Sequence, residues 1–175
     1  RDVGLISGVG RDFDMSMLSN LGLDTGAVEV ADLPTARAWQ VFEYDGTRLE
    51  IPRVTEEEWH EQLLPRPIAP HILSQLRGVH FQTSPQEARA AVAQSLMDAG
   101  VFIGAEVSIL PGATEEYRQG VLAGLYRFQL LSPDETEAAE LVGERPVRDT
   151  LVALADYGPR VVALRQGHNG STVYD

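Results

Sequence analysis

The sequence contains 175 residues, of which 43% are hydrophobic and 23% charged, a composition typical of a globular domain with a core of its own. The net charge is −12 and no basic run is present, so the composition argues against nonspecific binding to nucleic acid. The chain has no cysteine and no lysine, which excludes disulfides, thiol catalysis, Schiff-base chemistry and a Walker A lysine.

The first third of the chain predicts a strand, a helix and a hairpin. An apolar run predicts a buried strand over Val3–Gly8, and a helix follows near Phe13–Leu21. After a further strand-rich stretch, two predicted strands, Ala36–Tyr44 and Arg48–Ile51, flank Asp45-Gly46. An Asp-Gly pair between two apolar segments is a strong hairpin signal, so we expect a small flap here.

The rest of the chain alternates between helix and strand patterns. Thr55 and Glu58 form a capping box that opens a helix ending near Leu63, Pro65-Arg66-Pro67 marks a loop, and Pro70–Leu76 predicts a short helix. The further predicted strands are Val79–Gln82, Val101–Ala105, Phe128–Leu131, Arg160–Leu164 and Ser171–Tyr174. The further predicted helices are Pro85–Ala99, Thr114–Leu125, Pro133–Val142 and Val147–Tyr157.

Alternation of this kind indicates βαβ units and a parallel sheet. We therefore expect a single three-layer α/β domain over residues 1–175, with a mainly parallel central sheet and a small lid hairpin at residues 35–53. Neither end of the sequence resembles a natural terminus, and we expect the chain to be part of a longer protein.

The segment LLSPDETEAAELVG, residues 130–143, carries four acidic residues within seven positions. One interpretation is purely local: Ser132 caps the helix, Pro133 takes the first helical position, and Glu135 completes a capping box. The same pattern occurs at Ser84-Pro85-Gln86-Glu87, where no function suggests itself.

In a second interpretation, two of these acidic residues face a bound ligand. Ala138, Leu141 and Val142 define the buried side of the predicted helix, and Asp134 projects close to the same direction, with Glu137 beside it. An acid at the start of a helix that follows a strand lies at the carboxyl edge of a parallel sheet. In open α/β sheets this edge is where ligands bind.

Four segments, taken in order, resemble the middle of the ribokinase-like (PfkB) carbohydrate kinase family. VGLISGVGRDF (3–13) is similar to the family's strand, glycine turn and helix, and residues 21–46 are similar to the approach to its lid strands. Residues 130–143 resemble its Asn-x-x-Glu motif, and VVALRQGHNGSTVYD (161–175) resembles its strand, Gly-x-x-Gly turn and strand.

The resemblance implies a ribokinase-like fold and phosphorylation of a sugar or related small alcohol, or a nucleoside-like molecule, by ATP with Mg²⁺. It assigns Glu137 and Asp134 to the metal and phosphates, where hard carboxylate ligands suit magnesium. The other implied positions are Arg165, Gly167 and Gly170 on the nucleotide side and Gly10 and Asp12 on the substrate side.

The sequence departs from the family pattern at several positions. Asp134 stands at the Asn position, Gly104-Ala105-Glu106 replaces an Asp-x-Asn, and Arg165 occupies a position that is commonly Thr. The Gly-Ala-Gly-Asp signature, which supplies the anion hole and the general base, does not occur in these residues. We therefore expect the catalytic base to lie outside this chain and the chain alone to be inactive, and the departures keep a noncatalytic ligand-binding or regulatory protein as the alternative.

The remaining signals leave alternatives open. Trp39, Phe42 and Tyr44 suit a lid over a ligand, sheet packing, or a homodimer contact through the lid. Gly167–Gly170 predicts a hairpin turn with residues at positive φ, with or without nucleotide contact. No signal peptide or membrane span is apparent, so we expect a cytoplasmic protein without a membrane partner.

Overall fold

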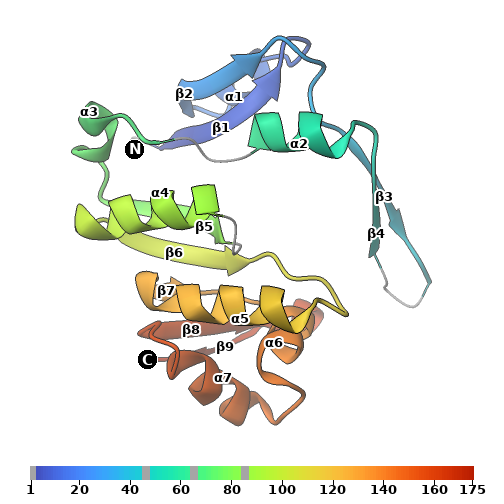
Figure 1. Ribbon diagram of the computed structural model, residues 1–175, viewed down its shortest axis with the longest axis vertical. Helices are drawn as coiled ribbons and strands as arrows, with labels where there is room; N and C mark the ends of the chain where they lie inside the picture. The colour runs from blue at the N-terminus through green and yellow to red at the C-terminus, as the bar shows by residue number, and fades with distance from the viewer. Residues whose placement is uncertain (1–2, 45–47, 64–66, 84–86) are drawn as a thin grey trace. The chain divides into compact units, whose positions relative to one another are not determined.

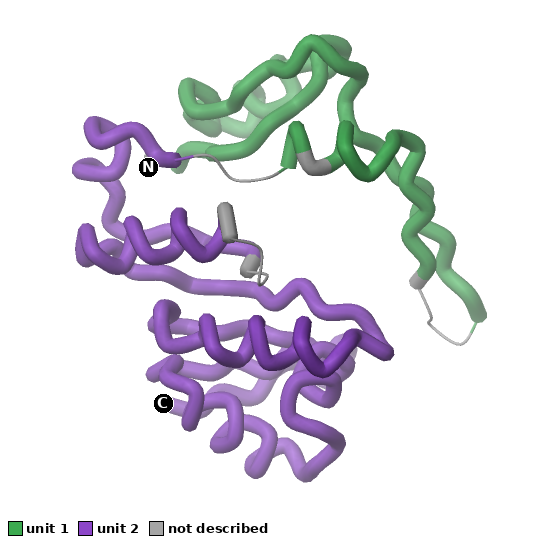
Figure 2. Tube along the Cα trace, in the orientation of Figure 1, with its two compact units in different colours: residues 1–65 green, residues 66–175 purple. Residues whose placement is uncertain are grey.

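The computed structural model describes residues 3–44, 48–63, 67–83 and 87–175, and the chain divides into two compact units (Figure 2). Unit 1 is Arg1–Pro65 and unit 2 is Arg66–Asp175. The predicted Asp45-Gly46 turn, the Pro65-Arg66 loop and the cap at Ser84-Pro85-Gln86 lie outside the described residues. No helix in the described part of the chain is long and apolar enough to cross a membrane.

Unit 1 consists of a parallel strand pair, an antiparallel hairpin and two helices (Figure 1). Its elements in order are β1 (Gly4–Gly10), α1 (Ser16–Ser19), β2 (Asp24–Ala31), β3 (Ala38–Phe42), β4 (Arg48–Pro52) and α2 (Glu56–Leu63). Strand β1 pairs in parallel with β2, and β3 pairs antiparallel with β4, so the predicted hairpin strands are confirmed.

The helix predicted over Phe13–Leu21 is reduced to the four residues of α1. The Asp14 carboxylate accepts hydrogen bonds from the Ser16 N–H at 3.0 Å and the Ser16 hydroxyl at 2.6 Å. A local side-chain turn of this kind competes with helical geometry, which accounts for the late start of the helix. Helix α2 begins where predicted, because the Thr55 hydroxyl accepts from the Glu58 N–H at 3.2 Å and the Glu58 carboxylate accepts from the Thr55 N–H at 2.8 Å.

Polar contacts hold the segment that leads into the hairpin, residues 33–37. The buried Gln62 side chain on α2 donates to the Pro34 carbonyl and accepts from the Ala36 N–H, each at 2.8 Å. The Leu33 carbonyl accepts from the Arg11 N–H at 2.9 Å. Beyond this anchored segment, apolar side chains on both hairpin strands are exposed, namely Trp39, Val41, Phe42, Leu49 and Ile51.

Unit 2 is built on a five-stranded sheet in the order β5-β6-β7-β8-β9. The strands are β5 (Gly78–Thr83), β6 (Phe102–Val107), β7 (Leu130–Leu131), β8 (Val161–Arg165) and β9 (Ser171–Tyr174). Strands β5 to β8 are parallel and β9 runs antiparallel to β8. The predicted fold class, an α/β protein with a mainly parallel sheet and a small hairpin, is therefore confirmed.

The helical segments of unit 2 follow the predicted alternation with small shifts. They are α3 (Pro70–Leu73), α4 (Glu87–Asp98), α5 (Glu115–Gly124), η1 (Leu125–Arg127), α6 (Glu135–Val142), α7 (Val147–Ala155) and η2 (Gly167–Asn169). Strand β7 is shorter than the predicted Phe128–Leu131, because the Phe128 N–H bonds to the Leu125 carbonyl at 3.0 Å and closes a 3₁₀ turn.

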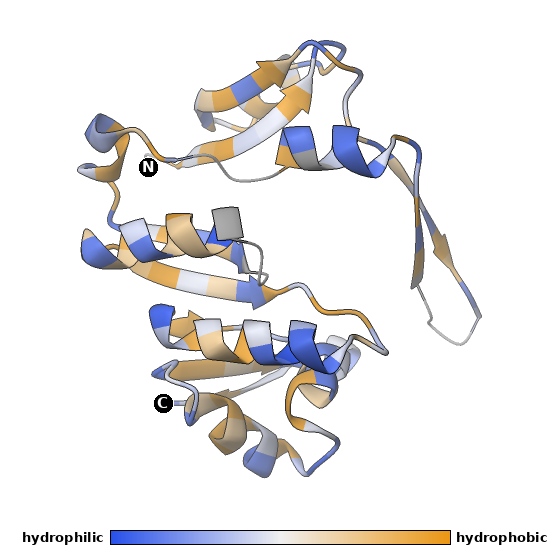
Figure 3. Ribbon diagram, in the orientation of Figure 1, coloured by the Kyte–Doolittle hydropathy of each residue, from blue (hydrophilic) through white to orange (hydrophobic). Residues whose placement is uncertain are grey.

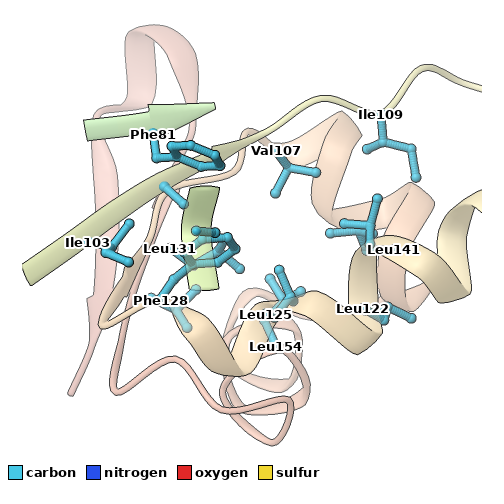
Figure 4. Close-up of a cluster of buried hydrophobic side chains, with 14 of the residues drawn as sticks. Phe81, Ile103, Val107, Ile109, Leu122, Leu125, Phe128, Leu131, Leu141 and Leu154 are labelled. Carbon is cyan, nitrogen blue, oxygen red and sulfur yellow. The ribbon is translucent and has the colours of Figure 1, made fainter. Parts of the chain in front are cut away.

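The hydrophobic core of unit 2 lies between its strands and helices (Figure 4). Leu96 on α4, Ile103 on β6, Leu131 on β7, Leu154 on α7 and Leu125 are all inaccessible to solvent. Figure 3 shows that β6 is largely apolar, with a hydrophilic segment just before its C-terminal end. Burial of these side chains supplies the main driving force for folding of the unit.

Replacing Leu131 by Ala should destabilise unit 2 by about 2–5 kcal/mol, because the side chain is fully buried and its loss leaves a cavity in the core. Chemical denaturation measures the loss. The matched control is Leu110→Ala, whose side chain is 75% exposed and whose effect should stay within about 0.5 kcal/mol. Equal effects of the two substitutions would contradict the assigned core.

Candidate functional site

The candidate site of unit 2 lies at the carboxyl edge of the parallel sheet, where four charged residues meet. Glu106 is the penultimate residue of β6, Asp134 and Glu137 lie at the start of α6, and Arg165 is the last residue of β8. The Arg165 N–H donates to the Pro133 carbonyl at 2.9 Å, and Asp134 forms a parallel bridge with Arg165. Pairing within the sheet therefore brings together residues that are far apart in the sequence.

The N-cap of α6 is Asp134, so the capping box predicted from Ser132 and Glu135 is wrong. Ser132 still follows the sheet, since its N–H donates to the Ala105 carbonyl at 2.8 Å. This nonlocal hydrogen bond delays the start of the helix by two residues. Glu135 instead accepts from the Gln166 side-chain amide at 3.0 Å.

The observed capping box joins the two acids that were predicted to face a ligand. The Asp134 Oδ1 accepts from the Glu137 N–H at 2.7 Å, and the Glu137 Oε2 accepts from the Asp134 N–H, also at 2.7 Å. Two reciprocal hydrogen bonds fix the backbone at the helix start and hold the Glu137 carboxylate beside it. Capping and a place at the sheet edge are thus combined in one pair of residues.

The Glu137 carboxylate is largely buried, with 17% of its side chain exposed. Burial raises its pKa above the usual range, and the negative charges of Asp134 and Glu106 act in the same direction. The Asp134 N–H and the Arg165 guanidinium oppose this rise. A further cation that reaches this carboxylate stabilises its ionised form.

The Arg165 guanidinium contacts two carboxylates. Its Nη2 lies 3.2 Å from the Glu137 Oε2, and its Nη1 lies 3.4 Å from the Glu106 Oε1. The same Glu106 oxygen lies 3.5 Å from the His80 Nε2. Glu106 was named only as a departure from the family pattern, and His80 was not predicted to lie in the site. The position of Glu106 near the C-terminal end of a parallel strand is the signal that would have indicated it, whereas His80 lies in the middle of β5 and gave no such signal.

The described residues offer a partial site for a divalent cation. No group of three or more His, Cys, Asp or Glu side chains in the described part of the chain is arranged to hold a metal ion. Mg²⁺ is commonly held by one or two protein carboxylates together with phosphate oxygens and water. Glu137 fits such a site. Its Oε2 accepts hydrogen bonds from the Asp134 N–H and from Arg165, and its carboxylate lies at the sheet edge.

The Gly167–Gly170 turn connects β8 to β9 directly beyond Arg165. Gly167 and Gly170 have φ values of 54° and 88°, and the Gln166 N–H donates to the Gly170 carbonyl at 2.8 Å. The predicted hairpin turn with positive φ is confirmed, and glycine suits both positions because it adopts this conformation without strain. Contact between this turn and a nucleotide stays a prediction.

In unit 1, Gly10 and Asp12 hold the segment before the hairpin. A Cβ at Gly10 would lie 2.1 Å from the Thr35 nitrogen, so only glycine fits there. The Asp12 Oδ1 accepts from the Thr35 N–H and the Thr35 hydroxyl, each at 2.6 Å, and its Oδ2 accepts from Arg37 at 2.7 Å. These contacts give Asp12 a structural task, and a contact between Asp12 and a substrate stays a prediction.

No protein-family model matches the chain. The chain is similar to the cytidine kinase of Thermococcus kodakarensis, with 26% identity over 178 residues that cover 99% of this chain and 61% of the relative. The chain therefore spans less than two thirds of the length of this relative.

Solved structures agree with the fold expected from the sequence. The PfkB protein from Polaromonas sp. JS666 matches with a TM-score of 0.74 and 19% identity, covering 98% of this chain and 63% of that protein. A putative ribokinase II from E. coli, in complex with ATP and Mg²⁺, matches with a TM-score of 0.72 and 18% identity, covering 99% and 59%. The predicted resemblance is confirmed in the fold, which is ribokinase-like over nearly the whole chain.

Asp12→Asn should weaken unit 1 at neutral pH. The two Thr35 hydrogen bonds, aided by the charge of Arg37, lower the pKa of Asp12 from 3.8 to about 2. A carboxyl with a lowered pKa in the folded state contributes stability that is complete above pH 3.8 and is lost as the pH falls toward 2. Hydrogen exchange of the Thr35 amide should therefore differ between wild type and variant at pH 6, and converge near pH 2.

The control for this experiment is Asp32→Asn. Asp32 forms an exposed ion pair with Arg11 at 2.7 Å, and pairs of this kind contribute little to stability. A pH-independent difference between wild type and Asp12→Asn would show that the carboxylate charge is not what holds the segment.

Proposed function

We propose that the protein is an ATP-dependent kinase of the ribokinase-like (PfkB) type, which phosphorylates a hydroxyl of a sugar or nucleoside-like small molecule. The observation that carries the proposal is the largely buried Glu137 carboxylate, fixed by the Asp134 capping box at the carboxyl edge of a parallel sheet. The similarity to a cytidine kinase and to a putative ribokinase with ATP and Mg²⁺ supports it.

The chemistry of phosphoryl transfer suits the charges at this edge. The protein contributes mainly positioning and electrostatic stabilisation, and a divalent cation neutralises the phosphates. In this proposal Glu137 and Asp134 hold Mg²⁺ with its water ligands, and Arg165 lies beside the phosphates. The turn containing Gly167 and Gly170 borders the nucleotide, where backbone can approach closely.

The acceptor side of the proposal rests on unit 1. Gly10 and Asp12 lie near the acceptor, and the hairpin at residues 35–53 covers it or forms a homodimer contact. The exposed Trp39 and Phe42 on that hairpin support either task. An Asp outside residues 1–175 acts as the general base, and the protein works in the cytoplasm.

A noncatalytic ligand-binding or regulatory protein is the second candidate. It is favoured by one observation, the contacts of the Arg165 guanidinium with both Glu137 and Glu106. A cation that already neutralises these carboxylates reduces their attraction for a metal ion.

An ADP-release assay with sugars and nucleosides, with and without Mg²⁺, tests the proposal on the full-length protein. We expect Mg²⁺-dependent turnover with one class of acceptor. Residues 1–175 alone should give none, because the base and the anion-hole amides lie outside them. Binding of ATP by the full-length protein without turnover on any acceptor would favour the noncatalytic candidate.

Glu137→Gln should lower turnover about a hundredfold or more, because the charge that organises the cation is removed. The same change should leave thermal stability equal or higher at pH 7. Burial raises the pKa of Glu137, so its ionised form costs stability above that pKa, and glutamine also satisfies a capping box.

The matched control is Glu140→Gln on the same helix. Glu140 accepts from the Gly112 N–H at 3.2 Å and lies outside the charged cluster, so turnover should be unchanged. Wild-type turnover and an unaltered Mg²⁺ dependence in Glu137→Gln would refute the role of Glu137.

A further inference from the structure

The Arg165 guanidinium is shared between two carboxylates and is held closely by neither. Its distances to Glu137 and Glu106 are 3.2 and 3.4 Å, whereas charge-assisted hydrogen bonds are typically about 2.7–2.9 Å. Other ion pairs of the chain reach that range: Arg11–Asp32 at 2.7 Å, Arg37–Asp12 at 2.7 Å and Arg118–Glu115 at 2.6 Å. The Arg160–Asp175 pair is also long, at 3.3 Å, but both of its side chains are mostly exposed, whereas the Glu137 carboxylate that Arg165 contacts is largely buried.

The Arg165 guanidinium also has hydrogen-bond donors that have no partner among the described residues. A guanidinium carries five N–H donors. The Arg165 Nε is buried and has no hydrogen-bond partner in the described part of the chain. The side chain as a whole is 42% exposed. Each terminal nitrogen of the guanidinium carries two N–H donors and contacts one carboxylate, so an acceptor that reaches the exposed part of the side chain finds unused donors there.

Arg165 is the positively charged group of the cluster, so an incoming anion is attracted to its guanidinium and repelled by the carboxylates. The Arg165 guanidinium contacts Glu106 and Glu137, and the Asp134 carboxylate caps the helix beside Glu137, so three carboxylates share one guanidinium in this cluster and two negative charges are left over. An anion approaching this edge is repelled unless the guanidinium turns toward it. The backbone of Arg165 is fixed by the Pro133 carbonyl at 2.9 Å, so the long side chain is the part that can turn.

We propose that Arg165 is a phosphate-binding residue with two alternative partners. In the free protein it neutralises Glu137 and Glu106, and when a nucleotide binds it turns onto a phosphate group and releases the Glu137 carboxylate for a cation. Glu106 is the resting partner that holds the guanidinium until the phosphate arrives. This inference rests on the proposed function, since it takes a nucleotide phosphate as the incoming anion.

A model in which Arg165 does not move predicts the opposite effect of replacing Glu106. If Glu106 only holds Arg165 in the geometry that binds phosphate, then Glu106→Gln should weaken the contribution of Arg165 to nucleotide binding. If Glu106 is the resting partner, its removal frees the guanidinium and should increase that contribution. The sign of the coupling between the two residues separates the two models.

The experiment is a double-mutant cycle on the full-length protein, read as the affinity for ATP in EDTA by calorimetry. R165Q should weaken ATP binding about tenfold, the value of one charge-assisted contact. E106Q should tighten ATP binding in both backgrounds through reduced repulsion. The gain should be about threefold larger when Arg165 is present than in the R165Q background.

Arg118→Gln is the matched control, because Arg118 forms an ion pair with Glu115 on α5, and ATP affinity should not change. Thermal melts of every variant confirm folding. If R165Q does not fold, Arg165→Lys replaces it in the cycle, and the same sign with a smaller effect is expected because one ammonium replaces a forked guanidinium.

The inference would be overturned if E106Q increased ATP affinity in the presence of Arg165 by no more than it does in the R165Q background. So would ATP binding that R165Q leaves unchanged, and in that case the proposed kinase function would stand. Absence of ATP binding by the wild-type protein in EDTA and in Mg²⁺ would overturn both.

Discussion

The reciprocal hydrogen bonds between Asp134 and Glu137 are the constraint on which the candidate site depends. They set the first residue of α6 and at the same time hold a carboxylate at the sheet edge. A capping box is ordinarily a local stabilising device worth about 1 kcal/mol. Here one member, Glu137, is also largely buried beside the Arg165 guanidinium. The interaction that starts the helix therefore also orients the carboxylate of the candidate site.

The positions at which the sequence departs from the ribokinase-like pattern turn out to be neighbours in space. Glu106 and Arg165 are separated by 59 residues in the chain and lie in contact at the ends of two strands. An added carboxylate and an added guanidinium compensate each other, and a forked guanidinium reaches two carboxylates in a way that a single ammonium does not. The chain, which contains no lysine, uses arginine at this point.

Local patterns predicted most of the fold, and nonlocal pairing explains what they missed. Apolar periodicity placed the strands and helices of unit 2 within a few residues, and the capping box at Thr55 correctly placed the start of α2 in unit 1. The start of α6 was misplaced because the Ser132 N–H bonds to the Ala105 carbonyl on another strand, a contact that no window around Ser132 contains. Glu137 and Arg165 were assigned to the site from the family resemblance, and Glu106 was named only as a departure from it. The contacts of Glu106 with Arg165 and His80 required knowledge of which strands are adjacent.

The anchoring of residues 33–37 bears on how freely the hairpin can change in evolution. Main-chain groups of Leu33, Pro34, Thr35 and Ala36 make most of these contacts, to Arg11, Asp12 and Gln62, whereas apolar side chains of β3 and β4 such as Trp39 are exposed. Exposed side chains away from such contacts tolerate substitution well. As far as folding stability is concerned, the hairpin surface can therefore change more freely than its point of attachment.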